Sequence, residues 1–329
     1  MCSVKYGSNI KTKMGIKNLN RFLLDNCSKR SIKKIHLKQL SKKTLTIDIS
    51  IYLYKFVGEN TLLESMYLFI SILKKYEITP IFIFDGKPPP EKKELLIKRR
   101  IEKLEAEQKY NDLQKQMEGL TEEKILEMEN LRKQFIRITE EDITKVKLLL
   151  EAYSVRYYDS PYEADQLCAH FVKERIAWGC ITDDMDMFLY GCTNVIRHIS
   201  LLNHTAVIYD FQMILRDLQM SEDNFREIMV LSGTDYNMKL ETSLYSTMKR
   251  YNEYNKYLFQ NKDLSVDFYD WLSIHTDYLK DKESLMKIYN MFLLTNYDFS
   301  ELNIEPKETV IEMEKLKSIM ETEGFIFLV

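Results

Sequence analysis

The chain has 329 residues, of which 45% are hydrophobic and 29% are charged, and its formal net charge is −3. This length predicts one large or two medium domains, and the apolar fraction is ample for a core. No run approaches the ~18 apolar residues of a membrane span, and the opening MCSVKYGSNIKTK lacks the apolar stretch of a signal peptide. Five cysteines without a CxxC pair are typical of a reducing compartment. We therefore expect a soluble, intracellular protein that is neither secreted nor bound to a membrane.

The first part of the chain predicts helices that alternate with strands. Residues 1–13 are polar and basic without periodicity, and we expect a tail there. A short helix is expected at 16–26, followed by a buried strand that closes on Asp48 and runs into a further helix. An amphipathic helix at 64–77 precedes a second strand at 79–85, whose continuous apolar residues predict burial on both faces.

Residues 91–136 form a highly charged segment that follows the sequence GKPPP. Proline blocks helix continuation, so a new element must start there. The segment is rich in helix formers, with a break at 119–121. We interpret it as a helical arch that protrudes over the functional site. The alternative is a solvated helical hairpin without a part in function.

The second half of the chain continues the alternation and then becomes helical. A capping-box pattern at Thr139 starts a helix at 139–154. Further elements are expected as a strand at 155–159, a helix at 162–174, a strand at 178–182, and two strands or a hairpin at 194–200 and 205–210. From about 210 the pattern is helical. The sequence therefore predicts an α/β fold with a mostly parallel, twisted sheet flanked by helices, and a C-terminal helical lobe.

Acidic residues follow the predicted strands at each point where a strand ends. The carboxyl ends of parallel strands meet at one edge of a sheet, where ligands bind. Carboxylates gathered there repel one another unless cations neutralise them. The pattern therefore predicts a metal site. Its candidate ligands are Asp48, Asp85, Glu163, Asp165, Asp184, Asp186 and Asp235.

Carboxylate oxygens with few histidines select Mg²⁺ or Mn²⁺ over zinc. Seven acids indicate two ions, because Mg²⁺ usually takes one or two protein carboxylates. Such a pair activates a water and stabilises the leaving oxygen in phosphodiester cleavage. Without the seven acids the rest of the chain is net positive, so the overall charge does not exclude nucleic acid. Candidates for binding the phosphate are Lys92, Lys98, Arg99 and Arg100, which follow Asp85 closely.

These motifs have the order and spacing of a known family. The chain resembles the flap endonuclease branch of the XPG-like structure-specific 5′ nucleases, from Met14 to near its end. The matching motifs are MGIKNL (14–19), IDIS (47–50), FDGKPPPEKK (84–93), SPYEADQLCA (160–169), ITDDMDMFLYG (181–191), LSGTDY (231–236) and ELNIEPKETVIEMEKLKSIMETEGF (301–325). The resemblance implies a PIN-like nuclease core, divided into an N-terminal nuclease region at 14–160 and an internal region with the helical lobe at 161–329.

The resemblance also implies roles at the matching positions, and it leaves Asp183 out of the ligand set. Asp165 is expected close to both metals. Tyr54 would stack on a nucleotide near the cut, a sequence-tolerant contact; its alternative is a core tyrosine. The implied first-metal ligands are Asp48, Asp85, Glu163 and Asp165, and the second-metal ligands are Asp184, Asp186 and Asp235. The scissile phosphate would contact Lys92 and Arg99, and the chain start at Gly15 would lie near the DNA. Lys98 and Arg100 are further candidates for binding the substrate by their position after Asp85.

The activity implied by the resemblance is metal-dependent, structure-specific 5′ hydrolysis of phosphodiester bonds in DNA. The cut would fall near single-strand/duplex junctions of a 5′ flap, nick or gap, during replication, repair or recombination. The implied cofactors are two Mg²⁺ ions, with Mn²⁺ as a substitute. A 5′→3′ exonuclease or junction resolvase of the same superfamily is the alternative, and a non-catalytic DNA-structure binder is a third hypothesis.

Three features depart from the family pattern. Thirteen residues precede the expected start at Met14. The stretch 238–252 contains no glycine where the family has a Gly-rich helix–two-turn–helix, which puts the K⁺ site and the grip on the downstream duplex in doubt. No sliding-clamp motif is recognisable, and Phe325 and Phe327 are expected to be packing residues. Divergence around an intact site is what we expect of a large DNA virus or a divergent eukaryote, acting in the nucleus, the cytoplasm or a viral factory.

Overall fold

The computed structural model describes residues 16–115, 121–237, 242–261, 266–304 and 310–327. The expected tail at 1–13, Gly15 and most of the expected break at 119–121 lie outside these ranges. Within the described residues, no helix is long and apolar enough to cross a bilayer.

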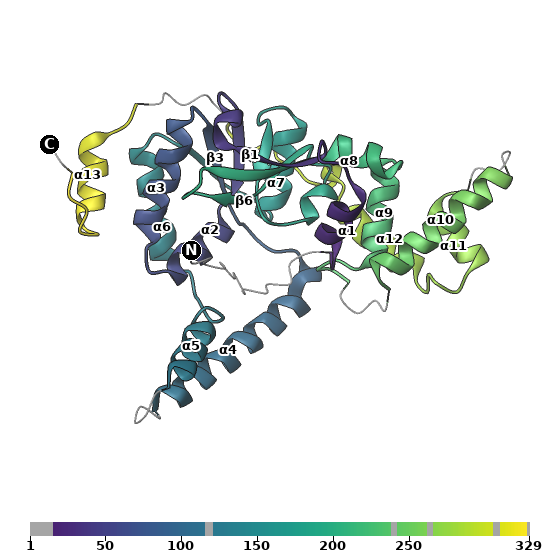
Figure 1. The fold of residues 1–329 in the computed structure, drawn as a ribbon, viewed down its shortest axis with the longest axis horizontal. Helices are drawn as coiled ribbons and strands as arrows, with labels where there is room; N and C mark the ends of the chain where they lie inside the picture. The colour runs from purple at the N-terminus through teal and green to yellow at the C-terminus, as the bar shows by residue number, and fades with distance from the viewer. Residues whose placement is uncertain (1–15, 116–120, 238–241, 262–265, 305–309, 328–329) are drawn as a thin grey trace, which may run out of the picture.

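Strands and helices alternate through the first two thirds of the chain, and helices follow (Figure 1). The strands are β1 (Ile32–His36), β2 (Thr44–Asp48), β3 (Thr79–Phe84), β4 (Arg156–Asp159), β5 (Gly179–Ile181), β6 (Asn194–Ser200) and β7 (Thr205–Asp210). The α-helices are α1 (Leu19–Asn26), α2 (Ser50–Gly58), α3 (Leu62–Lys75), α4 (Lys93–Lys115), α5 (Glu122–Arg132), α6 (Glu140–Ala152), α7 (Ala164–Lys173), α8 (Phe211–Leu218), α9 (Glu222–Ser232), α10 (Leu244–Gln260), α11 (Phe268–His275), α12 (Lys282–Met291) and α13 (Met313–Glu321). Short 3₁₀ helices are η1 (Leu37–Leu40), η2 (Pro90–Lys92), η3 (Asp186–Phe188) and η4 (Leu294–Asn296).

The described strands form one sheet of seven in the order β1-β7-β6-β5-β2-β3-β4. Pairing is parallel from β6 through β5, β2 and β3 to β4, while β7 pairs antiparallel with β6 and β1. Helices cover both faces, so β3 buries its side chains alternately: Ile81 and Ile83 enter one core, and Phe82 and Phe84 the other. The prediction of a mostly parallel sheet flanked by helices is confirmed.

Strand β1 was not predicted from the sequence. Its two buried residues are Ile32 and Ile35, three positions apart, while Lys33, Lys34 and His36 are exposed. This spacing breaks the alternation with period two by which a half-buried strand is recognised. The strand forms because antiparallel pairing with β7 at the edge of the sheet satisfies its backbone.

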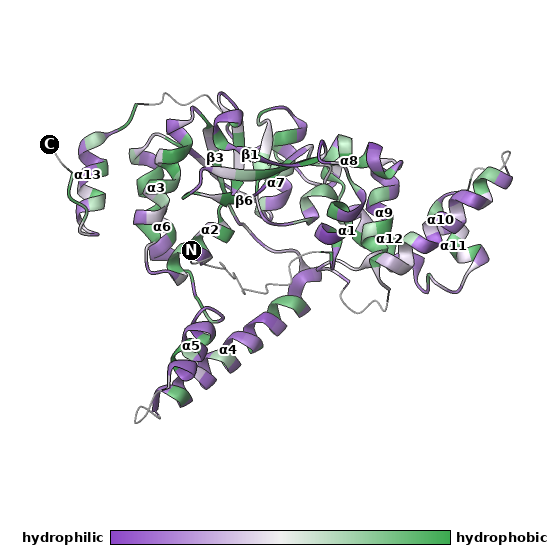
Figure 2. Cartoon of the chain, in the orientation of Figure 1, coloured by the Kyte–Doolittle hydropathy of each residue, from purple (hydrophilic) through white to green (hydrophobic). Residues whose placement is uncertain are grey.

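Helices α4 and α5 form the expected hairpin, which projects from the body of the molecule (Figure 1). Of the residues of α4, only Leu95 and Ala106 are buried, and most of the hairpin surface is hydrophilic (Figure 2). Thr121 caps α5 by accepting a hydrogen bond from the Lys124 amide. The prediction of a protruding helical arch is confirmed.

The C-terminal helices lie at two opposite ends of the molecule (Figure 1). Helices α8 to α12 form a lobe beside the sheet, as predicted, whereas α13 returns to the far side next to α3 and α6. The Glu312 amide donates to the Ala152 carbonyl at 2.9 Å. The rings of Phe325 and Phe327 lie 5.2 and 6.1 Å from that of Tyr67. Their predicted packing role is confirmed.

Candidate metal centre

All seven candidate acids are brought to one edge of the sheet or directly beside it. Asp48 ends β2, Asp85 follows β3, and Asp184 and Asp186 follow β5. Because these strands are parallel neighbours, their carboxyl ends lie together. The other three acids come from helix ends: Glu163 is the N-cap of α7, Asp165 lies in its first turn, and Asp235 follows the end of α9.

The acids are close enough to perturb one another. Burial raises the pKa of Asp48 to about 8, and the charges of Asp85 and Asp184 add to the rise. Burial likewise raises the pKa of Asp165, with Asp184 and Asp48 as further causes. For Asp186 the causes are burial and then the charges of Asp184 and Asp235. Such mutual perturbation means that the group is unstable in its charged form without cations.

Two buried carboxylate oxygens in this group have no hydrogen-bond partner: Oδ1 of Asp165 and Oδ1 of Asp186. A buried oxygen without a donor is costly, and hard cations such as Mg²⁺ satisfy it. The donor set therefore fits magnesium. Among the described residues, no three His, Cys, Asp or Glu side chains are grouped closely enough to hold one ion as they stand. Mg²⁺ usually keeps several waters and takes only one or two carboxylates directly.

Two cations from the base of the arch pair with the acids. Lys92 Nζ donates to Glu163 Oε1 at 2.7 Å, and both side chains are largely buried. Burial opposes the charge on Lys92, yet the carboxylates of Glu163 and Asp165 raise its pKa above the ordinary value, so the ammonium stays charged. Arg99 donates to Asp235 Oδ2 at 3.0 Å. The arch is thus anchored to the acid group at two points.

Tyr236 is a member of this group that the sequence analysis did not single out. Its hydroxyl donates to Glu163 Oε2 at 3.0 Å, and Lys92 Nζ lies 5.1 Å from the centre of its ring. It therefore holds the carboxylate and supports the lysine at the same time. The available signal was its position directly after Asp235 in LSGTDY.

The backbone at Gly86 fixes the relation between two acid-bearing segments. The Gly86 amide donates to the Tyr162 carbonyl at 2.7 Å, and the Ala164 amide donates to Asp85 Oδ1 at 2.8 Å. A Cβ at position 86 would overlap the Ser160 carbonyl and come within 2.6 Å of the Tyr162 carbonyl. Only glycine allows this approach, which sets the end of β3 against the start of α7.

Among the described residues, the remaining candidates Tyr54, Lys98 and Arg100 make no hydrogen bond or ion pair with the seven acids. Tyr54 on α2 is 41% exposed, which argues against a core tyrosine, and Lys103 Nζ lies 4.9 Å from its ring centre. Lys98 is exposed on α4 and lies 4.0 Å from Glu102, while Arg100 is also exposed. Gly15 lies outside the described residues.

Asp183, which the resemblance leaves out of the ligand set, bonds to β6. Its Oδ1 accepts a hydrogen bond from the His198 amide at 3.0 Å. The buried Arg197 donates to the Asp183 carbonyl at 2.8 Å and to Asn20 on α1 at 3.1 Å. This packing role for Arg197 fixes the backbone directly before Asp184.

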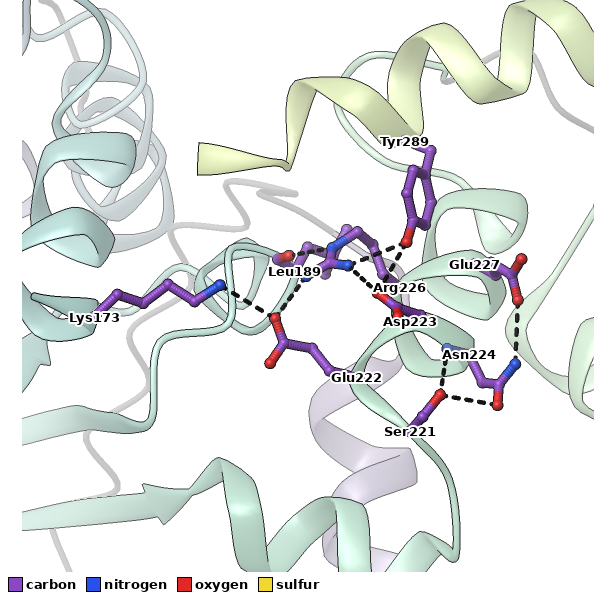
Figure 3. Close-up of polar contacts among 9 residues, drawn as sticks. All are labelled: Lys173, Leu189, Ser221, Glu222, Asp223, Asn224, Arg226, Glu227 and Tyr289. Atoms are coloured by element: carbon purple, nitrogen blue, oxygen red, sulfur yellow. Dashed lines mark hydrogen bonds and ion pairs between the residues drawn. The ribbon is translucent and has the colours of Figure 1, made fainter. Parts of the chain in front are cut away.

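A buried arginine joins the segments that carry the second group of acids (Figure 3). Arg226 on α9 is only 3% exposed, and its Nε donates to the Leu189 carbonyl at 2.7 Å, three residues beyond Asp186. Because α9 leads into Asp235, this bond fixes two acid-bearing segments to each other.

The same guanidinium holds three further side chains (Figure 3). It donates to Glu222 at 2.7 Å, to Asp223 at 2.8 Å and to the Tyr289 hydroxyl on α12 at 3.2 Å. Lys173, at the end of α7, pairs with Glu222 at 3.4 Å. Sequence analysis missed this network. Its one local signal is the spacing of Arg226, which lies three positions after Asp223 and four after Glu222.

Fold and site together define a class of protein: an α/β fold whose parallel strands carry clustered carboxylates, with a helical arch anchored beside them by basic residues. Comparison with known sequences agrees. The XPG N-terminal domain model matches residues 14–106 and the XPG I-region model matches 154–235, together more than half of the chain. All seven acids lie within these stretches. The chain belongs to the XPG family.

Individual relatives are similar but distant. "Flap endonuclease 1" of Chlamydomonas reinhardtii is 30% identical over 242 residues, which cover 68% of this chain and 59% of the relative. The chain therefore spans less than two thirds of that protein's length. "Probable RAD2-like endonuclease 369L" of Invertebrate iridescent virus 6 is 28% identical, with coverage of 68% and 67%. A catalytic core of Rad2 solved with DNA has a TM-score of 0.66 at 20% identity, with coverage of 94% and 96%, which shows the fold.

The close approach at Gly86 predicts a specific sensitivity. Gly86→Ala should lower the free energy of unfolding by about 1–3 kcal/mol, as overpacking against rigid backbone does. Urea denaturation followed by circular dichroism measures this. The control is Gly58→Ala, whose Cβ would meet only the flexible end of Ile136; it should change stability by less than about 1 kcal/mol. Equal effects of the two substitutions would contradict the assignment.

The Arg226 network predicts a second difference in stability. Arg226→Met should cost about 2–3 kcal/mol, less than the roughly 3–5 kcal/mol for a fully buried pair, because Asp223 stays in contact with water. Tyr289→Phe removes one hydroxyl from the same network and should cost only about 0.5–1.5 kcal/mol. Denaturant midpoints of the two variants test the order. A smaller loss for Arg226→Met than for Tyr289→Phe would show that Arg226 is not the centre of the network.

Proposed function

We propose that this protein is a metal-dependent, structure-specific 5′ nuclease that hydrolyses phosphodiester bonds in DNA near single-strand/duplex junctions. The observation that carries the proposal is the meeting of seven carboxylates, two of them with unsatisfied buried oxygens, with two cations from the arch. Family membership supports it. The relatives named flap endonuclease favour a 5′ flap, nick or gap as substrate.

Two Mg²⁺ ions, replaceable by Mn²⁺, are proposed for the acid group. When bound, they supply activation of the attacking water and charge stabilisation at the leaving oxygen. Asp165 is proposed to serve both ions, which is supported by its closeness to acids of both sets: the charges of Asp184 and Asp48 add to the effect of burial in raising its pKa. The proposed first set is Asp48, Asp85, Glu163 and Asp165, and the second is Asp184, Asp186 and Asp235.

Lys92 and Arg99 are proposed to bind the scissile phosphate. In the protein alone they neutralise Glu163 and Asp235, which are themselves proposed metal ligands. Cations bound to these carboxylates would replace the two side chains as counter-charges and would leave them available to a phosphate. They would hold the phosphate against the acids and offset charge that develops on its oxygens.

Tyr54 is proposed to stack on a base beside the cut, with Lys103 lying over its ring in the protein alone. Lys98, Arg100 and Gly15 are proposed to lie near the DNA, and the 5′ strand to pass by the arch. We propose residues 14–160 and 161–329 as the two nuclease regions behind a tail at 1–13. We propose that the protein acts in an intracellular compartment that holds DNA. A K⁺ site near 238–252 is not part of the proposal.

The central test compares two adjacent aspartates. Asp184→Asn should reduce Mg²⁺-dependent cleavage of a labelled 5′-flap DNA by more than about 100-fold, since even outer-shell partners of a metal typically contribute 10–100-fold. The DNA should remain bound. The control is Asp183→Asn, whose side chain bonds the His198 amide instead and should leave cleavage unchanged. Retained activity in Asp184→Asn would refute the metal assignment.

A substrate panel separates the alternatives. Flap, nick, gap, blunt duplex and four-way junction DNA are incubated with the wild-type protein and Mg²⁺. A single product cut near the flap junction supports the proposal, whereas a ladder of short products from blunt ends indicates an exonuclease and symmetrical cuts in the junction indicate a resolvase. No metal-dependent product on any of them, together with no Mg²⁺ binding by calorimetry, would leave the non-catalytic binder.

The proposed stacking role of Tyr54 has its own test. Tyr54→Ala should weaken flap binding by about 1–3 kcal/mol, the usual contribution of one base–aromatic stack. Tyr54→Phe keeps the ring and should bind within about twofold of wild type. Fluorescence anisotropy in EDTA measures both without cleavage. Equal losses in the two variants would mean that the hydroxyl, and not the stacking face, matters.

A further inference from the structure

One stretch of this acidic chain contains several basic residues and no acidic ones. Residues 28–43 include seven Lys and Arg and no Asp or Glu, although the whole chain has 50 acids. The stretch contains β1 and both of its flanks. Segregation of charge on this scale creates a local positive potential that the net charge of −3 hides.

Six of these side chains are exposed, and we call the five that lie in β1 or closest to it the basic edge: Lys29, Arg30, Lys33, Lys34 and Lys38. Within the described part of the chain, none of the five has an acidic partner within ion-pair distance. Nearby acids are engaged elsewhere: Asp217 accepts from Ser28 and Ser31, and Glu77 accepts from Ser41.

The sheet connects the basic edge to the candidate metal centre. β1 pairs antiparallel with β7, and β7 pairs antiparallel with β6, so β1 runs in the same direction as β2 and β5. Its C-terminal end therefore leaves the sheet on the side that carries the acids. There the Leu37 amide donates to the His204 carbonyl at the β6–β7 turn, and His198 on β6 contacts Asp183 beside Asp184.

Protection of an exposed sheet edge is the simplest alternative role for these lysines. It accounts for Lys33 and Lys34 within the strand. It does not account for the basic residues of the flanks, such as Lys29, Arg30 and Lys38, which have no edge to protect. Like charges without acidic partners on both flanks of the strand instead fit a polyanionic ligand.

The apolar residues of the same stretch help to distinguish two candidate ligands, an acidic peptide and the phosphate backbone of a nucleic acid. Ile32, Ile35, Leu37 and Leu40 are all buried, so the surface offers charge without an apolar anchor. A bound peptide draws specificity from side-chain pockets, whereas a phosphate backbone needs only positioned cations. A five-residue strand spans about 16 Å, enough to follow several phosphates of a duplex.

We propose that the basic edge binds the phosphate backbone of a duplex arm of the DNA substrate, independently of sequence and away from the cut. The proposal rests on the proposed function in taking DNA as the substrate. This contact of the duplex with β1 and its flanks is additional to the DNA contacts that we propose for the acid group and the arch. Lysine suits this contact because its ammonium acts as a point charge on a flexible stem.

The test is the salt dependence of duplex binding, measured in EDTA so that no cleavage is needed. Lys33→Gln/Lys34→Gln should lower the slope of log K against log salt by roughly 2, since each phosphate contact contributes about 0.9. A second variant, Lys29→Gln/Arg30→Gln, lies outside the strand and should lower the slope as well. It keeps the test valid if changes in β1 cause aggregation.

The matched control also removes two positive charges, but from lysines outside the basic edge. Lys145→Gln/Lys287→Gln changes two exposed lysines that are paired with Glu141 and Glu283, and it should keep the wild-type slope. Equal slopes in all variants, or equal losses in all of them, would overturn the proposal. So would an acidic peptide that binds the basic edge while both basic-edge variants keep the wild-type DNA slope. A protein that cleaves no DNA refutes the nuclease proposal alone, because the slopes are measured without cleavage.

Discussion

The repulsion among buried carboxylates at one edge of the sheet is the constraint on which the rest of this structure depends. Parallel strands deliver Asp48, Asp85 and Asp184 to neighbouring positions, and burial makes the charges of Asp48 and Asp184 costly. Such a group persists only if cations are supplied from outside the sheet. The base of the arch supplies two of them, Lys92 and Arg99, and this links the charge of the site to the position of the projecting arch.

The arch is held differently on its two legs. The α4 leg is anchored by ion pairs to acids that are proposed metal ligands. The α5 leg is anchored to α2, where Arg132 donates to Asn60 at 2.9 Å and Ile136 lies against Gly58. Cations that bind the acids would therefore weaken one anchor and leave the other unchanged.

The sequence predicted those features of the fold that depend on local patterns. Strand ends carry the acids, Thr139 and Asp142 form the expected capping box, and the arch is a helical hairpin. Long-range features escaped prediction for physical reasons. The strand β1 exists through pairing with β7 rather than through its own periodicity. Arg226 acts through Leu189 and Tyr289, which are 37 and 63 positions away in the chain, and no local pattern encodes such contacts.

Net charge was the weakest guide to function, because it averages over surfaces that act separately. The same chain holds an acid group that attracts cations and a basic edge that is free of acids. Under the proposed function, we expect DNA affinity to depend on salt through the basic edge and cleavage to depend on metal through the acid group.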